Sequence, residues 1–265
     1  MMITYALLDY NRPIESELCL KSIHKFSKFP YQIVYISNGG NQDYVVDYYK
    51  RGLIDKLILR KKNSGCGLGT RECFNDFDLN SDYIIYVQVD QFMIREFPKE
   101  EITEYISLLY HSKFFYIDLA GNQGNGNPSE RALLINKYNY RMIPNTIGGP
   151  GPYANYKWTE QSMQEYMRGN NFRFYIAPLL FSDNGKISRR EYPNGGELIQ
   201  FTDEKSVYIT KPITQRIDFP NIKFTNEEWE LILNNKWVNG TIPELHKNDS
   251  FKCWNRPISI NDVNI

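Results

Sequence analysis

The sequence has no excess of charge of either sign. Lysine and arginine together number 31, as do aspartate and glutamate, so the formal net charge at pH 7 is +0. A neutral chain has no overall electrostatic field that would draw it to DNA, RNA or an anionic membrane. Local basic clusters remain at Lys61-Lys62 and Arg189-Arg190. Binding to a polyanion through bulk charge is therefore disfavoured.

Cysteines are few, and they do not form a metal-binding or disulfide pattern. The four are Cys19, Cys66, Cys73 and Cys253, with no Cys-x-x-Cys pair among them. This spacing favours a reducing, cytoplasmic setting over a zinc site or a disulfide framework. The sequence also lacks an apolar run long enough to span a membrane and a secretory signal at its N-terminus. We therefore expect a cytoplasmic protein without a transmembrane segment.

Strand-like and helix-like segments alternate along the first hundred residues. The chain has 265 residues, of which 42% are hydrophobic, enough to fill the core of one large α/β domain. Alternation of this kind predicts a parallel sheet with right-handed crossovers. Strands are predicted at 3–8, 32–37, 56–60, 82–90, 113–117, 132–135, 172–177 and 207–209, and helices at 13–26, 43–50, 99–110, 158–168 and 226–234.

The segment 82–91 is the stretch around which the other elements are organised. Seven of its first eight residues suit a strand buried on both faces, and Asp90 and Gln91 follow directly. Open α/β sheets place their ligands at the carboxyl ends of such strands. We therefore expect Asp90 to be presented to a ligand and not buried. The alternative is a capping aspartate in an ordinary strand-to-loop turn.

A glycine-rich loop, 63–71, precedes this strand. It carries Gly65, Gly67 and Gly69, but it lacks the Gly-Lys-Ser/Thr ending of a phosphate-binding P-loop. The dinucleotide fingerprint would require glycine at Thr70 and belongs after the first strand. Glycine removes the Cβ atom that blocks close approach, so the loop suits direct contact between backbone and ligand. A flexible connector is the alternative interpretation.

Taken in order, these pieces resemble the nucleotide-sugar-dependent glycosyltransferases of the GT-A fold, especially glycosyltransferase family 2. The resemblance covers about residues 3–185. It rests on Asn11-Arg12-Pro13 with Cys19 to Ile23 on the next helix, Ser37-Asn38-Gly39, Asn63 with the three glycines, Gln88-Val89-Asp90, and Trp158-Thr159-Glu160-Gln161.

The resemblance implies an α/β architecture and a division of the chain. The expected fold is a Rossmann-like, mixed but mainly parallel sheet flanked by helices, with a C-terminal extension. The glycosyltransferase domain is expected at 1–200, with a nucleotide half at about 1–95 and an acceptor half at about 96–200. The remaining segment, 201–265, is expected to pack on that domain as the extension.

The resemblance also implies a divalent metal, Mn²⁺ or Mg²⁺. A cation held by carboxylate oxygen stabilises the charge that develops on a leaving nucleoside diphosphate. Asp90 is the expected ligand. Members of the family usually present Asp-x-Asp here, whereas this chain has Gln88 at the first position. Asp183 is the candidate for the missing ligand, although an ordinary turn residue is the favoured alternative for it.

The expected nucleotide contacts follow from the same motifs. They are Asn11, Arg12, Asn38, Asn63, Gly65, Gly67, Gly69, Arg71 and Gln88. Asn38 takes the place where the family often has an aspartate that faces the base or ribose, and it brings hydrogen bonding without charge. Arg189-Arg190 is a further candidate for the pyrophosphate, with a solvated surface strand as an equal alternative.

The acceptor side carries the expected general base. Direct displacement requires a group that takes the proton of the acceptor hydroxyl, and Glu160 at a helix start suits that role. Its alternative role is to complement the helix dipole. The usual following aspartate is Gln161 here. Aromatic side chains that could stack on an acceptor are Tyr153, Tyr156 and Trp158.

The combined hypothesis is an inverting glycosyltransferase that uses a nucleoside-diphosphate sugar, with a UDP-sugar favoured. The resemblance supplies the inversion. The acceptor is unidentified: a glycan or polymer precursor is favoured over a modified nucleic-acid base or a protein. One rival is an inactive carbohydrate- or nucleotide-binding protein of the same fold, because two acidic positions are amides. A second rival is a sugar nucleotidyltransferase, although residues 10–14 lack its glycine-rich basic signature.

Overall fold

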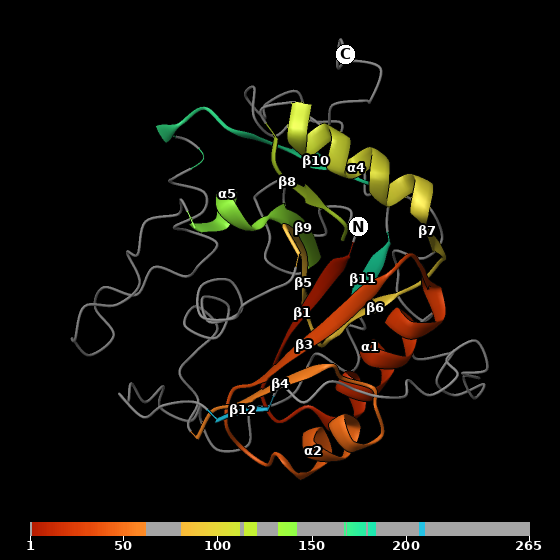
Figure 1. Ribbon diagram of the computed structural model, residues 1–265, viewed down its shortest axis with the longest axis vertical. Helices are drawn as coiled ribbons and strands as arrows, with labels where there is room; N and C mark the ends of the chain where they lie inside the picture. The colour runs from red at the N-terminus through yellow and green to blue at the C-terminus, as the bar shows by residue number, and fades with distance from the viewer. Residues whose placement is uncertain are drawn as a thin grey trace.

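The core of the molecule is a sheet of eight strands in the order β10-β8-β9-β5-β1-β3-β4-β12 (Figure 1). This computed structural model describes residues 2–61, 81–111, 114–120, 132–141, 167, 169–178, 180–183 and 207–209. In sheet order the strands are β10 (Arg173–Ile176), β8 (Phe114–Asp118), β9 (Ala132–Asn136), β5 (Tyr83–Gln88), β1 (Ile3–Asp9), β3 (Tyr31–Ser37), β4 (Lys56–Leu59) and β12 (Val207–Ile209).

Four neighbouring strands, β5, β1, β3 and β4, run parallel and form the centre of the sheet. All seven residues of β1 are buried, as the apolar sequence predicts for a strand covered on both faces. Successive side chains of a strand point to opposite faces. Tyr5 and Leu7 accordingly belong to one hydrophobic cluster, and Ala6 and Leu8 to another. The parallel centre predicted from the alternating pattern is confirmed.

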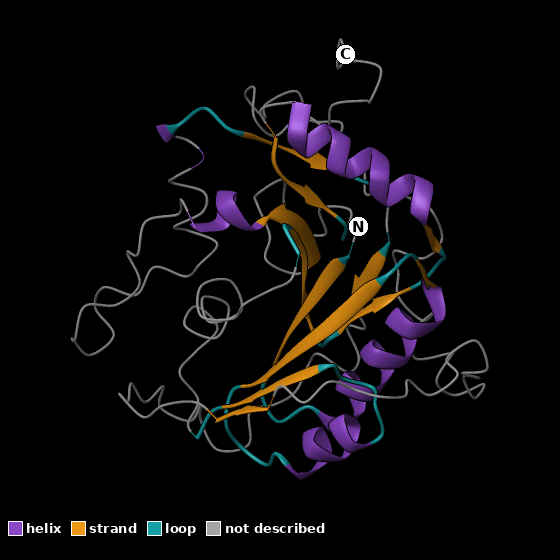
Figure 2. Cartoon of the chain, viewed as in Figure 1, coloured by secondary structure: helices purple, strands orange, loops and turns teal. Residues whose placement is uncertain are grey.

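Three helices of the described ranges cover one face of this sheet. They are α1 (Pro13–Phe26), α2 (Asp43–Lys50) and α4 (Lys99–His111), and their buried residues share a cluster with Tyr5 and Leu7. Figure 2 shows these helices in purple along the orange sheet. The α1 helix begins at Pro13, whose fixed φ suits a first helical position, and basic residues occupy its last turn. It ends where Ser27 becomes extended.

The other half of the sheet is mixed. Strand β9 runs antiparallel to both β5 and β8, while β10 is parallel to β8. A short helix, α5 (Lys137–Arg141), follows β9. The mixed, mainly parallel sheet that we expected is therefore confirmed.

Two small ladders lie beside the main sheet. Strand β6 (Gln91–Met93) pairs antiparallel with β11 (Phe181–Asp183), and β2 (Ser27–Lys28) pairs with β7 (Phe97–Pro98). The sequence did not predict β2, β6, β7 or β11 as strands, because segments of two or three residues give only a weak periodic signal. The first ladder matters for the site, since its register sets Asp183 directly opposite Gln91.

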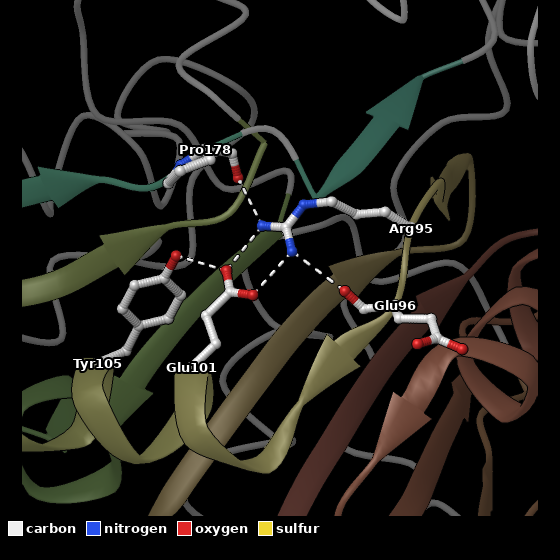
Figure 3. A network of polar contacts seen from close by, with 5 residues as sticks. All are labelled: Arg95, Glu96, Glu101, Tyr105 and Pro178. Atoms are coloured by element: carbon white, nitrogen blue, oxygen red, sulfur yellow. Dashed lines mark hydrogen bonds and ion pairs between the residues drawn. The ribbon is translucent and has the colours of Figure 1, made fainter.

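A polar clamp fixes this ladder to α4 (Figure 3). Arg95, just after β6, donates two hydrogen bonds of 2.7 Å to the carboxylate of Glu101 in the first turn of α4. It also donates to the backbone oxygens of Glu96, at 3.1 Å, and Pro178, at 3.3 Å. Tyr105 donates to Glu101 at 2.6 Å. Because Pro178 lies between β10 and β11, the clamp joins the helix to the turn that leads into β11.

We expect Arg95→Met to lower the free energy of unfolding by about 1.5–3 kcal/mol, the usual range for hydrogen bonds to a charged group. Burial alone would raise the pKa of Glu101, yet the hydrogen bonds from Arg95 and Tyr105 hold that pKa below its ordinary value. Urea unfolding at neutral pH measures the loss. Arg51→Met, which breaks exposed pairs with Asp47 and Glu17, is the control and should cost less than about 1 kcal/mol. Equal losses of unfolding free energy in the two variants would show that the clamp stabilises the fold no more than an exposed ion pair does.

Several predicted elements lie outside the described residues. They are the 226–234 helix, the glycine-rich loop and, apart from Met167, the 158–168 helix. Strand β12 lies in the predicted extension and pairs antiparallel with β4 at one edge of the sheet. The division of the chain at residue 200 stays a prediction. Among the helices of the described ranges, none has the length and apolar character needed to cross a bilayer.

Candidate functional site

The carboxyl ends of the parallel strands meet at one edge of the sheet and bring several polar residues together. Asp9 ends β1, and its backbone oxygen accepts a 2.8 Å hydrogen bond from the backbone N–H of Asn38, just past β3. Leu8 lies opposite Gln88 at the end of β5. Open α/β sheets bind their ligands at the carboxyl ends of the strands, where the strand order reverses. The sequence-predicted residues at these strand ends are therefore neighbours in space.

The turn after β1 is tightly packed against the loop after β3. Asn11 has φ of 54°, a left-handed conformation that asparagine tolerates better than most residues. Gly40 faces it with φ of 77°, and a Cβ atom on Gly40 would come within 3.2 Å of the Asn11 Cβ atom. The close approach explains why glycine suits this position. It also fixes Asn11 and the start of α1 relative to the end of β3.

Asp9 is a buried carboxylate beside this turn, with only 1% of its surface exposed. It accepts hydrogen bonds from the Tyr44 hydroxyl and, at 3.3 Å, from the backbone N–H of Arg12. Burial raises the pKa of Asp9 to about 6, although the hydrogen bond from Tyr44 partly opposes the rise. Burial of the Tyr44 hydroxyl and the nearby charge of Asp9 raise the pKa of Tyr44. Tyr44 therefore stays a hydrogen-bond donor to Asp9 at neutral pH.

Arg12 and Asp90 form an ion pair across this edge, from the Arg12 Nη1 atom to the Asp90 Oδ2 atom. The two side chains are 25% and 13% exposed. The other oxygen of Asp90, Oδ1, is buried and has no hydrogen-bond partner within the described part of the chain. Asp90 thus follows β5 at the carboxyl edge of the sheet, with its carboxylate turned towards Arg12 and partly buried. Its presentation to a ligand stays a prediction.

Gln91 adds a second unpartnered oxygen next to Asp90. Its side chain is 2% exposed, and its Oε1 atom finds no hydrogen-bond partner among the residues placed by the structure. Directly opposite is the backbone of Asp183 in β11. Buried acceptors without donors are rare, and they mark a place where a cation or a donor group can bind.

The oxygen donors at this point suit a hard divalent cation. Mg²⁺ and Mn²⁺ prefer carboxylate and carbonyl oxygens, and the Asp90 Oδ1 atom is an anionic oxygen that lacks a partner in the described ranges. Within those ranges no three His, Cys, Asp or Glu side chains gather to form a complete metal site. The backbone of Asp183, which the sequence suggested as a ligand, lies opposite Gln91, the residue after Asp90. Asp90 could therefore supply one oxygen ligand to a divalent cation.

Part of the predicted site is described and part is not. Arg12, Asn11, Asn38, Gln88 and Asp90 all lie at the edge described above, and Asn38 is buried. Outside the described residues are Asn63, Gly65, Gly67, Gly69, Arg71, Tyr153, Tyr156, Trp158, Glu160 and the pair Arg189-Arg190.

Sequence reasoning missed Asp9, Tyr44 and Gln91. A signal for Asp9 was present, since it closes an unbroken buried strand as Asp90 follows β5. Tyr44 gave no such signal, because an aromatic residue near a helix start is common on any amphipathic helix. Its role depends on a contact with Asp9, 35 residues away in the chain.

No protein-family model and no curated protein sequence matches the chain. Solved structures are similar to it. The mannosyltransferase PcManGT from Pyrobaculum calidifontis, in complex with GDP-Man and Mn²⁺, aligns over 68% of this chain and 56% of its own with 10% identity and a TM-score of 0.51. S. aureus TarS 1-349 in complex with UDP-GlcNAc aligns over 72% and 61% with 11% identity and a TM-score of 0.49.

A third structure, the apo-form glycosyltransferase GlyE of Streptococcus pneumoniae TIGR4, aligns over 66% of this chain and 45% of its own with 15% identity and a TM-score of 0.42. The chain thus spans between 45 and 61% of the length of these three proteins. The match to PcManGT, together with the strand order, shows the fold: it is the GT-A fold of nucleotide-sugar glycosyltransferases. The narrower resemblance to family 2 stays a prediction.

Proposed function

We propose that this chain is a glycosyltransferase that moves a sugar from a nucleoside-diphosphate donor, with a UDP-sugar favoured, to a hydroxyl acceptor with inversion. The observation that carries the proposal is the Arg12–Asp90 pair, with its unpartnered Oδ1 oxygen, at the carboxyl edge of a GT-A sheet. GDP-Man in the PcManGT complex supports a nucleotide-sugar donor. The scattered cysteines favour a cytoplasmic location as part of this proposal.

The nucleotide half supplies the donor contacts. Asn11 and Asn38 stand at the ends of β1 and β3, where the base and ribose of a nucleotide bind in such sheets. The 63–69 loop and Gln88 complete this set, and Arg71 with Arg12 would bind the diphosphate, since guanidinium pairs with phosphate through two hydrogen bonds. Asp90 and Asp183 would hold Mn²⁺ or Mg²⁺. A divalent cation bound there neutralises charge on the leaving nucleoside diphosphate.

The acceptor half would supply the proton transfer. Glu160 takes the proton of the acceptor hydroxyl while that oxygen forms a bond to the anomeric carbon of the sugar. The bond from the anomeric carbon to the diphosphate breaks, and its electron pair leaves with the nucleoside diphosphate. Tyr153, Tyr156 and Trp158 would stack on the acceptor. A glycan or polymer precursor is favoured, ahead of a nucleic-acid base or a protein.

The test starts from ligand binding, because a ligand that binds the native state raises its stability. The purified full chain is heated with UDP, GDP, CDP or ADP, with and without Mn²⁺. We expect one nucleotide to raise the unfolding temperature, and more strongly with Mn²⁺. The matching sugar nucleotide is then incubated with candidate acceptors. Release of the nucleoside diphosphate with sugar transfer supports the proposal. A separate incubation with the nucleoside triphosphate and a sugar phosphate tests the rival, because a nucleotidyltransferase would join them and release pyrophosphate.

Glu160→Gln is the matched variant for this assay. It should keep the thermal shift with the nucleotide and slow transfer by about 10²-fold or more, the usual effect of losing a general base. Transfer at the parental rate would remove Glu160 from the mechanism. Nucleotide binding without any transfer by the parent would favour the inactive binding protein, a rival supported by the amides Gln88 and Gln161.

A further inference from the structure

We propose that Arg12 is a built-in counter-ion that competes with a divalent cation for Asp90, so that the protein binds the cation tightly only when a donor diphosphate draws Arg12 away. The inference rests on the metal site of the proposed function. It concerns a role of Arg12 that goes beyond diphosphate binding, namely control of when the cation can bind.

The first support is the placement of the Arg12 charge. Arg12 is the N-cap residue of α1, and its guanidinium contacts the Oδ2 atom of Asp90, which lies 78 residues further along the chain. Both side chains are largely shielded from water, at 25% and 13% exposure. Charges in such places interact more strongly than exposed pairs, which water and salt screen. Arg12 therefore neutralises the carboxylate expected to hold the cation.

The second support is that the positions flanking Asp90 in the sequence add no negative charge. The position two residues earlier is Gln88, which has no charge, and so is the following residue, Gln91. In the described ranges, no three His, Cys, Asp or Glu side chains gather into a group that could hold a metal ion. A cation at Asp90 would then share one carboxylate with a guanidinium, and the two like charges repel each other.

The third support is that the ion pair with Arg12 uses only one of the two carboxylate oxygens of Asp90. The Asp90 Oδ1 atom is buried and accepts no hydrogen bond from any residue in the described ranges. A position for a cation therefore exists beside Asp90, and Arg12 lowers its affinity without filling it.

The donor offers Arg12 a better partner than Asp90. A diphosphate carries more negative charge than one carboxylate and accepts paired hydrogen bonds from a guanidinium. Arg12 is a quarter exposed, so a diphosphate at the carboxyl edge of the sheet can reach it. When Arg12 turns to the diphosphate, the charge of Asp90 becomes available to the cation. The cation and the donor therefore bind cooperatively, because each favours the same separation of Arg12 from Asp90.

The experiment measures Mn²⁺ binding to the nucleotide-free full chain by electron paramagnetic resonance of free Mn²⁺. We expect weak binding by the parent and a gain of about tenfold or more for Arg12→Gln, the lower end of what a neighbouring charge does to the proton affinity of a carboxylate. Arg12→Lys, which keeps the charge, should stay near the parent. Arg51→Gln, which removes a positive charge from exposed ion pairs with Asp47 and Glu17, should match the parent.

Two further variants make the result decisive. The gain must vanish in Arg12→Gln with Asp90→Asn, which shows that the additional Mn²⁺ binds at Asp90. Arg12→Met replaces Arg12→Gln if the glutamine variant does not fold. Equal Mn²⁺ affinity of the parent and the neutral Arg12 variants would overturn the inference, and so would tight Mn²⁺ binding by the nucleotide-free parent.

The outcome is separable from that of the proposed function, because the Mn²⁺ titration contains no nucleotide. A gain in Mn²⁺ affinity together with no binding of any nucleoside diphosphate would keep the competition and reject the donor. Sugar transfer by the parent with no gain in the Arg12 variants would keep the glycosyltransferase and reject the competition. With UDP present, the parent should approach the Mn²⁺ affinity of Arg12→Gln.

Discussion

Asp90→Asn is expected to lower kcat/KM for sugar transfer by about 10²–10³-fold, the usual cost of removing one electrostatic contact to developing charge. Asparagine keeps the size of the side chain but removes the charge. The ion pair with Arg12 is lost, and the Oδ1 position no longer offers an anionic oxygen to a cation. Steady-state kinetics with the donor and acceptor found in the nucleotide screen measure the effect.

Asp82→Asn is the matched control for this substitution. Asp82 precedes the same strand, β5, at its opposite end, where its carboxylate is 62% exposed and pairs with Lys137 at 3.0 Å. The change in chemistry is identical, but the location is far from the carboxyl edge of the sheet. We expect kcat/KM to stay within about twofold of the parent, as for a surface ion pair. Similar losses in the two variants would contradict the role of Asp90.

Asp9→Asn is expected to remove a pH dependence of roughly 3 kcal/mol from the free energy of unfolding. Burial raises the pKa of Asp9 from 3.8 to about 6. In the window between these values the unfolded chain has lost the proton while the folded protein still holds it. Stability contributed by this proton is present below pH 3.8 and is lost as the pH rises through 6. Asparagine does not titrate, so the variant lacks this loss.

The measurement is the difference in unfolding free energy between Asp9→Asn and the parent, from urea unfolding at several values of pH. That difference should shift in favour of the variant by roughly 3 kcal/mol between about pH 3.5 and about pH 7.5. A constant penalty is also expected, because the asparagine amide cannot accept both hydrogen bonds that Asp9 accepts. Asp47→Asn on the exposed face of α2 controls for the loss of a carboxylate. A difference that does not change with pH would contradict a raised pKa.

The central strands and the first helices could be predicted closely from the sequence. Strand β1 and its neighbours are buried on both faces, which produces continuous apolar segments that are easily recognised. Helix α2 has the predicted bounds, and α1 begins at Pro13 as predicted, where the proline restricts where a helix can start. The direction of β9 could not be predicted individually, because local periodicity is the same for parallel and antiparallel strands.

The convergence of the strand ends was predictable from the sequence, but the contacts of their side chains were not. Strand ends that carry Asn38 and Asp90 converge by a general rule of α/β topology, so their proximity followed once the strands were known. Arg12 and Asp90 are 78 residues apart in the chain, and their ion pair depends on how the two side chains orient in the folded protein. No local sequence pattern encodes that orientation. The pKa of Asp9 likewise depends on burial by several elements together. Both properties emerge only from tertiary packing.

The pairing of β12 with β4 has a consequence for solubility. A strand at the rim of a sheet exposes a row of backbone hydrogen-bonding groups, which invite another chain to add on and begin aggregation. Without β12, the strand in that position would be β4, with the apolar residues Leu57, Ile58 and Leu59. Residues 207–209 occupy those backbone groups in antiparallel register. Strand β12 is then itself the rim of the described sheet, and a very short rim strand is one way in which native sheets limit self-association.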